Sequence, residues 1–408
     1  MSDLYFDRYA YPKRFIKSES RPDTFIRVVI PVFNEPDIRP TLESLAQCNP
    51  TKRGIEVILV INHAENASET IKENSRKTVD QINEFIIQNT SDLVIHIIKA
   101  FDLPKKKAGV GLARKIGMDE AAYRFNSINQ DGVILCFDAD SLCEKNYLCE
   151  IENHFLKYPD CNAASIHYEH PETNEDGNLN EPIILYELHL RYYIQALKYT
   201  DYPFAYHTIG SSMAARSSVY QKQGGMNQRK AGEDFYFLHK IIPLGNFHTI
   251  TSTKVIPSAR ISDRVPFGTG RAMQEHQNNT KDLNLTYDFE CFKIIKAFMN
   301  EINIKSNISD FYSTIKSFLI ENGLETELNK IQSQSKNQTH FKQRFFEWFN
   351  GFKMLKLVHY LRDNQFHEKL LISQATALLI ELGYEINQNP TALELLKIYR
   401  QLDIDSGN

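Results

Sequence analysis

Four short, continuous apolar runs, separated by segments of helical periodicity, constrain the fold of this chain most. The apolar runs span residues 25–32, 55–61, 93–98 and 133–137, with helical patterns at 38–46, 68–88 and 109–125. Strands that are apolar on both faces are typical of a parallel sheet covered by helices on both sides. We therefore predict an α/β domain with a mostly parallel sheet and a ligand crevice at the carboxyl ends of its strands.

The fourth apolar run ends in two carboxylates, Asp138 and Asp140, separated by one alanine. Residues two apart in an extended chain project to the same side, so both side chains reach one place. Such a D-x-D pair suits a hard cation, Mg²⁺ or Mn²⁺, which in turn can hold the phosphates of a nucleotide. A helix cap or a solvated turn is the competing interpretation of so short a motif.

Composition and length narrow the class of protein. The chain has 408 residues, enough for two domains, and its 42% apolar and 24% charged residues are typical of a soluble globular protein. The formal charge of -4 gives no support for binding nucleic acid. The six cysteines form no CxxC pair and no signal peptide or spanning segment is recognisable, so we expect reduced thiols and a cytoplasmic protein.

Further motifs follow these strands in a fixed order. The first strand leads into IPVFNE at 30–35, and GSSMAAR at 210–216, GGM at 224–226 and GED at 232–234 come later. Together with the D-x-D, this order resembles the family 2 glycosyltransferases of GT-A fold, which carry an IPxYNE opening, a GGF-like turn and an ED motif. The resemblance extends from about Ile26 to Leu244 and implies a GT-A nucleotide-diphospho-sugar transferase fold.

The resemblance implies a donor site at the ends of the first and fourth strands. Pro31, Asn34 and Glu35 are expected beside the nucleotide base and ribose. Asp138 is expected to contact the ribose or the cation, and Asp140 to ligate the cation that bridges the donor diphosphate. The chemistry agrees, because a departing nucleoside diphosphate needs a Lewis acid to stabilise its charge.

The ED pair is expected to act on the acceptor. Asp234 resembles the general base that takes the proton from the acceptor hydroxyl, and Glu233 is the second catalytic candidate, orienting the acceptor. Direct displacement by such a base inverts the configuration of the sugar. The alternative is that both acids only provide the negative charge that a helix N-terminus favours.

Two segments with donor-binding candidates depart from the family pattern. Where many members have a DDGS-like run, this chain has Asn62, which could still bond a base edge without a charge. The run 105–115 resembles the family's G-x-x-x-ARN segment with Lys115 as its last residue; its Gly109 and Arg114 are expected near a phosphate, against the alternative of a solvated basic loop.

The remaining donor-binding candidates are Gly210 and two arginines, Arg260 and Arg264, in a loop rich in glycine and proline. Guanidinium groups suit phosphate or carboxylate, so we expect this loop to close over the diphosphate or an anionic acceptor, against a structural loop paired with surface acids. For a third metal ligand, which GT-A enzymes often take from this region, the nearest candidates are His248 and His276.

The last third of the chain is expected to be helical. Apolar residues recur at spacings of three and four from about Asn278 onward, which divides the chain into an N-terminal extension (1–25), a GT-A catalytic domain (26–277) and a C-terminal helical domain (278–408). We expect one helix across residues 341–364. The aromatic and basic residues of 341–361 suit either core packing or peripheral contact with a membrane surface.

These features predict a metal-dependent transferase that moves a single sugar from a UDP- or GDP-linked donor to a sugar, lipid-linked or small-molecule hydroxyl. No QxxRW motif follows the ED pair, and the one tryptophan is Trp348, which argues against a processive synthase. Two alternatives stay open: a retaining transferase resembling mannosylglycerate synthases, and a noncatalytic nucleotide-sugar-binding protein.

Overall fold

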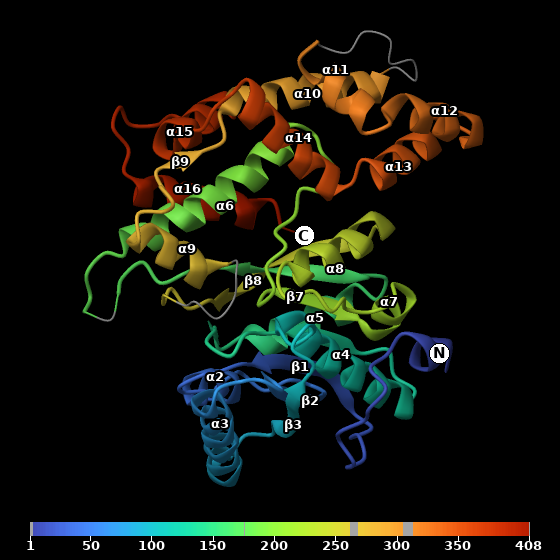
Figure 1. The fold of residues 1–408 in the computed structure, drawn as a ribbon, viewed down its shortest axis with the longest axis vertical. Helices are drawn as coiled ribbons and strands as arrows, with labels where there is room; N and C mark the ends of the chain where they lie inside the picture. The colour runs from blue at the N-terminus through green and yellow to red at the C-terminus, as the bar shows by residue number, and fades with distance from the viewer. Residues whose placement is uncertain (1–2, 175, 262–267, 305–312, 408) are drawn as a thin grey trace. The chain divides into compact units, whose positions relative to one another are not determined.

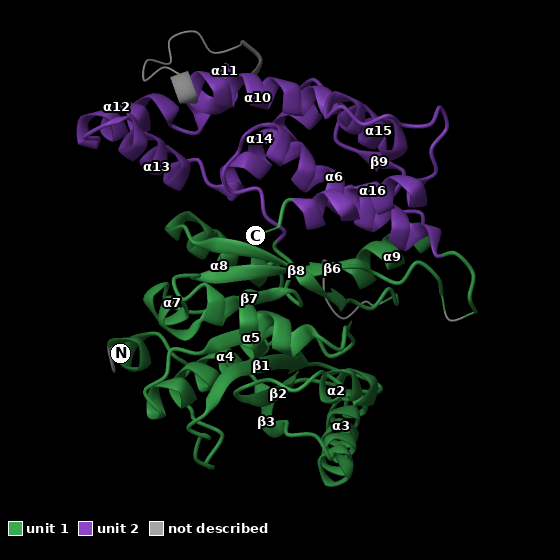
Figure 2. Cartoon of the chain, turned by 180° about the vertical axis from the view of Figure 1, so that it is seen from behind, with its two compact units in different colours: residues 1–179, 208–278, 406–408 green, residues 180–207, 279–405 purple. Residues whose placement is uncertain are grey.

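The computed structural model describes residues 3–174, 176–261, 268–304 and 313–407 (Figure 1). The chain divides into two compact units (Figure 2): unit 1 holds residues 1–179, 208–278 and 406–408, and unit 2 holds residues 180–207 and 279–405. The helix α6 (Glu181–Tyr199) packs against C-terminal helices within unit 2. The three-part division expected from the sequence stays a prediction.

Unit 1 contains one eight-stranded sheet, in the order β3-β2-β1-β4-β7-β6-β8-β5. Its strands are β1 (Thr24–Val32), β2 (Gly54–Ala64), β3 (Val94–Leu103), β4 (Val133–Cys136), β5 (Leu142–Cys143), β6 (Ala163–Tyr168), β7 (Met213–Arg216) and β8 (Phe247–Ile256). Its helices are α1 (Asp3–Arg8), α2 (Arg39–Ala46), α3 (Glu69–Gln88), α4 (Val110–Ser127), α5 (Tyr147–Lys157), α7 (Ser217–Lys222), α8 (Glu233–Ile241), the 3₁₀ turn η1 (Ile242–Leu244) and α9 (Thr269–Gln277).

The sheet is mostly parallel, which confirms the predicted fold class. β1, β2, β3 and β4 pair in parallel, as do β6 and β8, whereas β7 runs antiparallel to both β4 and β6. Because β7 reverses direction between them, β4, β6 and β8 all point the same way. The carboxyl ends of β1 and β4 therefore meet at one edge of the sheet, which we call the carboxyl edge.

Both faces of the sheet are covered, which explains the uninterrupted apolar runs. In β1, Val28 and Ile30 belong to the core cluster that also contains buried residues of α2, α3 and α5. Val29 points to the other face, where Gly117 of α4 comes so close that a Cβ there would lie 2.5 Å from Val29 Cγ1 and 2.9 Å from Val60 Cγ2. The helix α4 is thus packed directly on the central strands β1 and β2.

The N-terminal extension is bound to the outer face of α4. The hydroxyl of Tyr5 donates to Asp119 Oδ1 at 2.5 Å, and the backbone N–H of Tyr11 donates to Asp119 Oδ2 at 2.6 Å. Glu120, the next residue of α4, accepts from the N–H of Phe15 at 3.1 Å. Hydrogen bonds to charged acceptors are about twice as strong as neutral ones, so the extension is held firmly.

Unit 2 is built from helices, as predicted. Besides α6 they are α10 (Phe289–Ile304), α11 (Ser313–Glu321), α12 (Leu324–Gln334), α13 (Gln338–Trp348), α14 (Gly351–Asn364), α15 (Leu371–Glu381) and α16 (Ala392–Asp405). One exception is the antiparallel pair β9 (Leu285–Thr286) and β10 (Lys369–Leu370). Among the helices of both units that the structure describes, none has the length and apolar composition of a membrane span.

The single helix expected across residues 341–364 is wrong, because the chain breaks into α13 and α14. The side chain of Asn350 accepts hydrogen bonds from the N–H groups of Phe352 and Lys353, at 3.1 and 3.2 Å, which starts a new helix. Asparagine is among the best N-cap residues, and apolar periodicity does not register such a cap. Core packing accounts for Phe341 and Phe345, which are buried.

A buried ion-pair cluster joins the start of the sheet to α4. Glu56 of β2 accepts from Arg27 Nε at 2.6 Å and from Arg124 Nε and Nη2, both at 2.9 Å. Burial raises the pKa of Glu56, but hydrogen bonds from Arg124 and Arg27 outweigh that effect and lower it from 4.5 to about 2. The carboxylate therefore stays charged inside the protein throughout the neutral range.

Replacing Glu56 by glutamine leaves two buried guanidinium groups without their counter-charge. We expect Glu56→Gln to lower the free energy of unfolding at neutral pH by about 3–5 kcal/mol. Since the pKa of Glu56 is lower in the folded than in the unfolded chain, its contribution is complete above pH 4.5 and is lost as the pH falls toward 2.

Urea unfolding of wild type and variant at several pH values measures both effects. The matched control is Glu73→Gln in α3, whose pair with Lys77 is 62% and 65% exposed, and we expect a change below about 1 kcal/mol. A wild-type advantage over Glu56→Gln that does not shrink in acid would contradict this account.

Candidate active site

Five carboxylates are contributed to the carboxyl edge of the sheet by separate elements. Glu35 lies three residues past β1, Asp138 and Asp140 follow β4, and Glu233 and Asp234 open α8. The D-x-D turn is fixed from both sides. Thr41 Oγ1 of α2 donates to the carbonyl of Ala139 at 2.9 Å, and the N–H of Ser141 donates to the carbonyl of Asp138 at 3.2 Å.

Arg114 of α4 connects the D-x-D turn to α8. Its side chain is only 4% exposed, and its Nη2 donates to Asp138 Oδ1 at 2.5 Å while Nη1 pairs with Glu233 Oε1. Burial lowers the pKa of Arg114, but the two facing carboxylates outweigh burial and raise it. Arg114, which we expected to face a phosphate, is thus held by the protein's own acids.

Gly210 lies against the guanidinium group of Arg114. A Cβ at this position would be 2.4 Å from Nη1 and 2.6 Å from Nη2, distances that real Cβ atoms do not adopt. Gly210 is therefore a position at which only glycine leaves Arg114 in its place. Its role in this structure is close packing against the arginine.

Arg260 forms a second link, between the ends of β1 and β4. Its Nη1 donates to Glu35 Oε1 at 2.8 Å, and its Nη2 pairs with Glu35 Oε2 and with Asp140 Oδ2, the latter at 3.0 Å. Glu35 is buried, with a side chain 1% exposed, whereas Asp140 is 26% exposed. The guanidinium of Arg260 thus binds the buried Glu35 through two nitrogens and the more exposed Asp140 through one.

The two aspartates of the D-x-D provide oxygen ligands of the kind that Mg²⁺ and Mn²⁺ prefer. Asp138 and Asp140 are 37% and 26% exposed, and Arg114 and Arg260 contact them at Asp138 Oδ1 and Asp140 Oδ2. The donor set therefore fits a hard divalent cation. A divalent cation at Asp140 would repel the nearby guanidinium of Arg260, which favours opening of its Nη2 contact while Glu35 keeps its bond to Nη1.

The two acids at the start of α8 differ in their contacts. Glu233 is paired with Arg114, whereas Asp234 forms no ion pair within the described residues and accepts the N–H of Phe235 at 2.7 Å. Burial raises the pKa of both carboxyl groups, against the opposing effect of Arg114. Gly232, with φ of 67°, supplies the left-handed residue that turns the chain into the helix.

Asn62 lies near the end of β2, next to β1, and is buried. Its Oδ1 has no hydrogen-bond partner among the described residues. A buried amide oxygen without a partner costs about 1–3 kcal/mol, so such an atom calls for an explanation. Binding the polar edge of a ligand is one.

The other predicted donor-site residues are placed as follows. Asn34 has φ of 49° and accepts a hydrogen bond from Asn74 at 2.8 Å, so its side chain is fixed just past β1. Pro31 lies buried inside β1, opposite Val60. Gly109 precedes α4 and packs against Lys230, and the exposed lysines before it are solvated. Arg264 lies outside the described residues.

Neither of the two histidines expected as a third metal ligand contacts Asp140 among the residues that the structure describes. His248 lies at the start of β8, the end of that strand remote from the carboxyl edge, and its Nδ1 is 3.0 Å from His154 Nε2. His276 is in the last turn of α9. The structure therefore gives neither residue a role at the D-x-D turn.

The sequence reasoning missed a polar group at the end of β6. His167 Nε2 lies 3.0 Å from Glu169 Oε1, and Lys254 Nζ of β8 donates to Glu169 Oε2 at 2.7 Å. The alternation in AASIHYEH, residues 163–170, is the signal that could have revealed both the strand and its polar end. It also missed the pairings of Arg114 and Arg260, which spacing does not encode.

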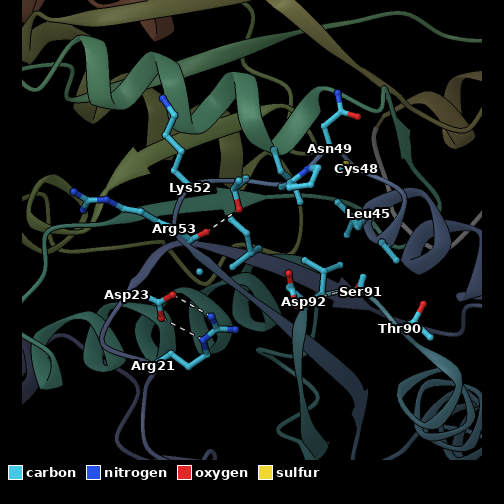
Figure 3. A pocket seen from close by; sticks show the side chains of 17 residues that line it. Arg21, Asp23, Leu45, Cys48, Asn49, Lys52, Arg53, Thr90, Ser91 and Asp92 are labelled. Carbon is cyan, nitrogen blue, oxygen red and sulfur yellow. Dashed lines mark hydrogen bonds and ion pairs between the residues drawn. The ribbon is translucent and has the colours of Figure 1, made fainter.

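A pocket of about 420 Å³ opens at the other edge of the sheet, where β1 and β2 begin (Figure 3). It is lined by residues such as Lys52, Arg53 and Ser91, with Arg21 and Asp23 joined to each other at 3.0 Å. No group of acids converges here among the lining residues. The pocket therefore lacks the group of carboxylates that the carboxyl edge contains.

Replacing Gly210 by alanine tests the role of the arginine. The added methyl group must displace the Arg114 guanidinium, so we expect Gly210→Ala to retain the fold and lower transferase kcat/KM roughly 100-fold, as misplacement by about 1 Å can. Gly407→Ala is the matched control, because its added methyl group would meet the side chain of Thr251 in β8 rather than an arginine of the site. Equal kinetics of the two variants, measured by release of nucleoside diphosphate, would contradict the assignment.

Comparison with known proteins agrees with the motifs. Residues 27–224 match the model of the family described as glycosyl transferase family 2. None of the curated proteins matches the chain.

Solved structures with a similar arrangement include S. aureus TarS residues 1–349 in complex with UDP-GlcNAc (12% identity, TM-score 0.39, 90% of this chain and 95% of that one). Another is GalNAc-T7 with UDP, GalNAc and Mn²⁺ (14% identity, TM-score 0.37, 76% and 58%). At scores this low the likeness carries no argument, and the family match is the finding that counts. Residues 27–224 belong to glycosyl transferase family 2, and the chain is a glycosyltransferase of GT-A fold.

Proposed function

We propose that this enzyme moves a single sugar, with inversion and with the help of a divalent cation, from a nucleotide-diphosphate sugar to a hydroxyl acceptor. The observation that carries the proposal is the ion-pair chain from Asp138 through Arg114 to Glu233, which brings the D-x-D turn and the ED helix to one place. A displacement at a sugar carbon needs an acid-rich cation site on the leaving side and a base on the attacking side. The ion-pair chain supports the presence of a cation site and a base at the same place.

The donor side is formed by Asp138 and Asp140. These two residues would hold Mg²⁺ or Mn²⁺, which supplies the Lewis acidity that stabilises the departing nucleoside diphosphate. Arg260 then releases Asp140 while its Nη1 stays on the buried Glu35, so the charge of Glu35 remains compensated. The freed Nη2 is left beside the donor site, where a guanidinium suits a diphosphate oxygen.

The base on the acceptor side is Asp234. Its carboxyl group is not held by a cation among the described residues, and its raised pKa makes the ionised form a better proton acceptor than an ordinary aspartate. Glu233 is paired with the buried guanidinium of Arg114, and accepting a proton would remove the negative charge that stabilises this pair. We therefore assign Asp234 as base and Glu233 as the residue that positions Arg114.

The nucleotide side is supported by Asn62. Its orphaned Oδ1 accepts a hydrogen bond, so it suits an N–H on the edge of a uracil or guanine base, consistent with a UDP- or GDP-linked donor. The acceptor hydroxyl belongs to a sugar, a lipid-linked glycan or a small molecule. We place the enzyme in the cytoplasm, where nucleotide sugars are available, with contact to the membrane surface for a lipid-linked acceptor.

Replacing Asp234 by asparagine separates catalysis from stability. Burial raises the pKa of Asp234 above its ordinary value of 3.8, so at any pH above 3.8 the ionised side chain opposes folding. A neutral asparagine should therefore leave the thermal midpoint equal or higher. The kcat should fall roughly 100- to 10,000-fold, with KM for the donor nearly unchanged. In the wild type, kcat should decline as the pH falls through the raised pKa of Asp234.

The control is Glu233→Gln, which removes one of the two carboxylates that hold Arg114 and should affect donor KM as well as kcat. Product stereochemistry, read by NMR, tests inversion directly. Retention of configuration would support a retaining mechanism instead, and full activity of Asp234→Asn would remove Asp234 as the base.

A calorimetric panel of UDP, GDP, CDP and dTDP sugars, with Mn²⁺ and with chelator, identifies the donor. We expect one nucleotide to bind with metal and to lose most of its affinity without it, and Asp140→Asn to lose the metal effect. Asp23→Asn is the matched control, since it alters an exposed aspartate–arginine pair at the other edge of the sheet. Metal-independent binding would show that the two arginines act without a cation, and binding without turnover of any acceptor would favour a noncatalytic protein.

A further inference from the structure

A second group of potential metal ligands lies in unit 1, outside the acidic site. It consists of His154 in the last turn of α5, Cys161 two residues before β6, and His248, the second residue of β8. Their ring nitrogen and sulfur atoms all lie within 4.8 Å of one another, and His154 Nε2 is 3.0 Å from His248 Nδ1. β6 and β8 point the same way as β4, so this group lies at the amino ends of the strands, opposite the D-x-D.

We propose that His154, Cys161 and His248 form a structural zinc site. Two imidazole nitrogens and one thiolate are the ligand types that Zn²⁺ prefers, and hard cations such as Mg²⁺ avoid them. In a tetrahedral site, zinc–ligand bonds of about 2.0–2.3 Å place the ligand atoms roughly 3.3–3.7 Å apart. The three atoms lie within 4.8 Å of one another, so side-chain rotations that move them by roughly 1 Å complete the site.

The backbone holds the ligands in register. Ala163 and Ala164 of β6 pair with Phe247 and His248 of β8, which fixes the segment after Cys161 beside His248. The loops before the two strands are joined by Asn162, whose N–H donates to the carbonyl of Asn246 at 2.8 Å. Sites built on paired strands and a helix are more preorganised than sites on loops.

The surroundings of the ligands suit metal binding. His154 and Cys161 are buried, and the ring of Tyr158 packs on both histidines, with centroids 4.9 and 5.1 Å away. Burial lowers the pKa of His154 to about 4 and also lowers that of His248, so both imidazoles are neutral at neutral pH. Their facing nitrogens share one hydrogen bond, so zinc binding requires the donor ring to carry its proton on its other nitrogen.

The thiol of Cys161 needs the metal to ionise. Burial raises its pKa to about 12, although Arg216 opposes the shift, and a bound zinc ion reverses this by binding the thiolate directly. When zinc binds, the thiol releases its proton to solvent and the resulting thiolate sulfur bonds to the metal. The fourth position falls to water or to Asp160, an exposed carboxylate next to Cys161 that also acts on the pKa of His248.

The full-length chain, freed of any polyhistidine tag and stripped with chelator, tests the site with Zn²⁺ and Co²⁺ as probes. We expect about one tightly bound zinc per chain, a rise in thermal midpoint on zinc addition, and with Co²⁺ the sulfur-to-metal charge-transfer band and tetrahedral visible bands that one thiolate ligand produces. Absence of the charge-transfer band in the wild type would overturn the proposal, whatever the variants do.

Variants assign the ligands. Cys161→Ser and His248→Ala should weaken zinc binding more than about 100-fold, since loss of even an outer-sphere partner costs 10- to 100-fold. Cys149→Ser, on the same helix as His154, and Asp140→Asn, at the proposed catalytic cation site, should retain zinc. Zinc lost in Asp140→Asn but kept in Cys161→Ser would show that the ion binds the acidic site, and would overturn the proposal without touching the transferase assignment.

Discussion

The proposed active site depends on the ion pairs that the buried guanidinium of Arg114 forms with Asp138 and Glu233. A cation with a 4% exposed side chain is tolerable only because Asp138 and Glu233 face it, and removal of one partner of such a pair costs about 3–5 kcal/mol. The positions of α4, the D-x-D turn and the start of α8 are therefore coupled through one side chain. Gly210 belongs to the same constraint, because any larger residue would occupy the place of the guanidinium.

The two arginines of the site differ in how freely they can exchange partners. Arg114 is enclosed, whereas Arg260 is 35% exposed and gives only one nitrogen to Asp140. Breaking that single, partly solvated contact costs little compared with the bond of Arg260 to the buried Glu35. One arginine is thus part of the scaffold, and the other can respond to a ligand.

The sequence was sufficient for the parts of the fold that follow from local pattern. The four apolar runs became β1, β2, β3 and β4, because strands covered on both faces must be apolar throughout. β7 was not foreseen, since its four residues, MAAR, are too few to show a period. The pairing of Arg114 with Glu233 joins residues 119 positions apart, and only the fold determines which carboxylate pairs with which arginine.

The same sheet separates two kinds of ligand chemistry. Turns at the carboxyl edge bring together oxygen donors such as Asp138 and Asp140, and the amino ends of β6 and β8 bring together the nitrogen and sulfur donors of His154, Cys161 and His248. Oxygen ligands favour Mg²⁺ or Mn²⁺, and a thiolate with imidazoles favours zinc, so each set discriminates against the other's ion. A zinc ion at the amino ends would tie α5, β6 and β8 together without competing for the cation of the transfer reaction.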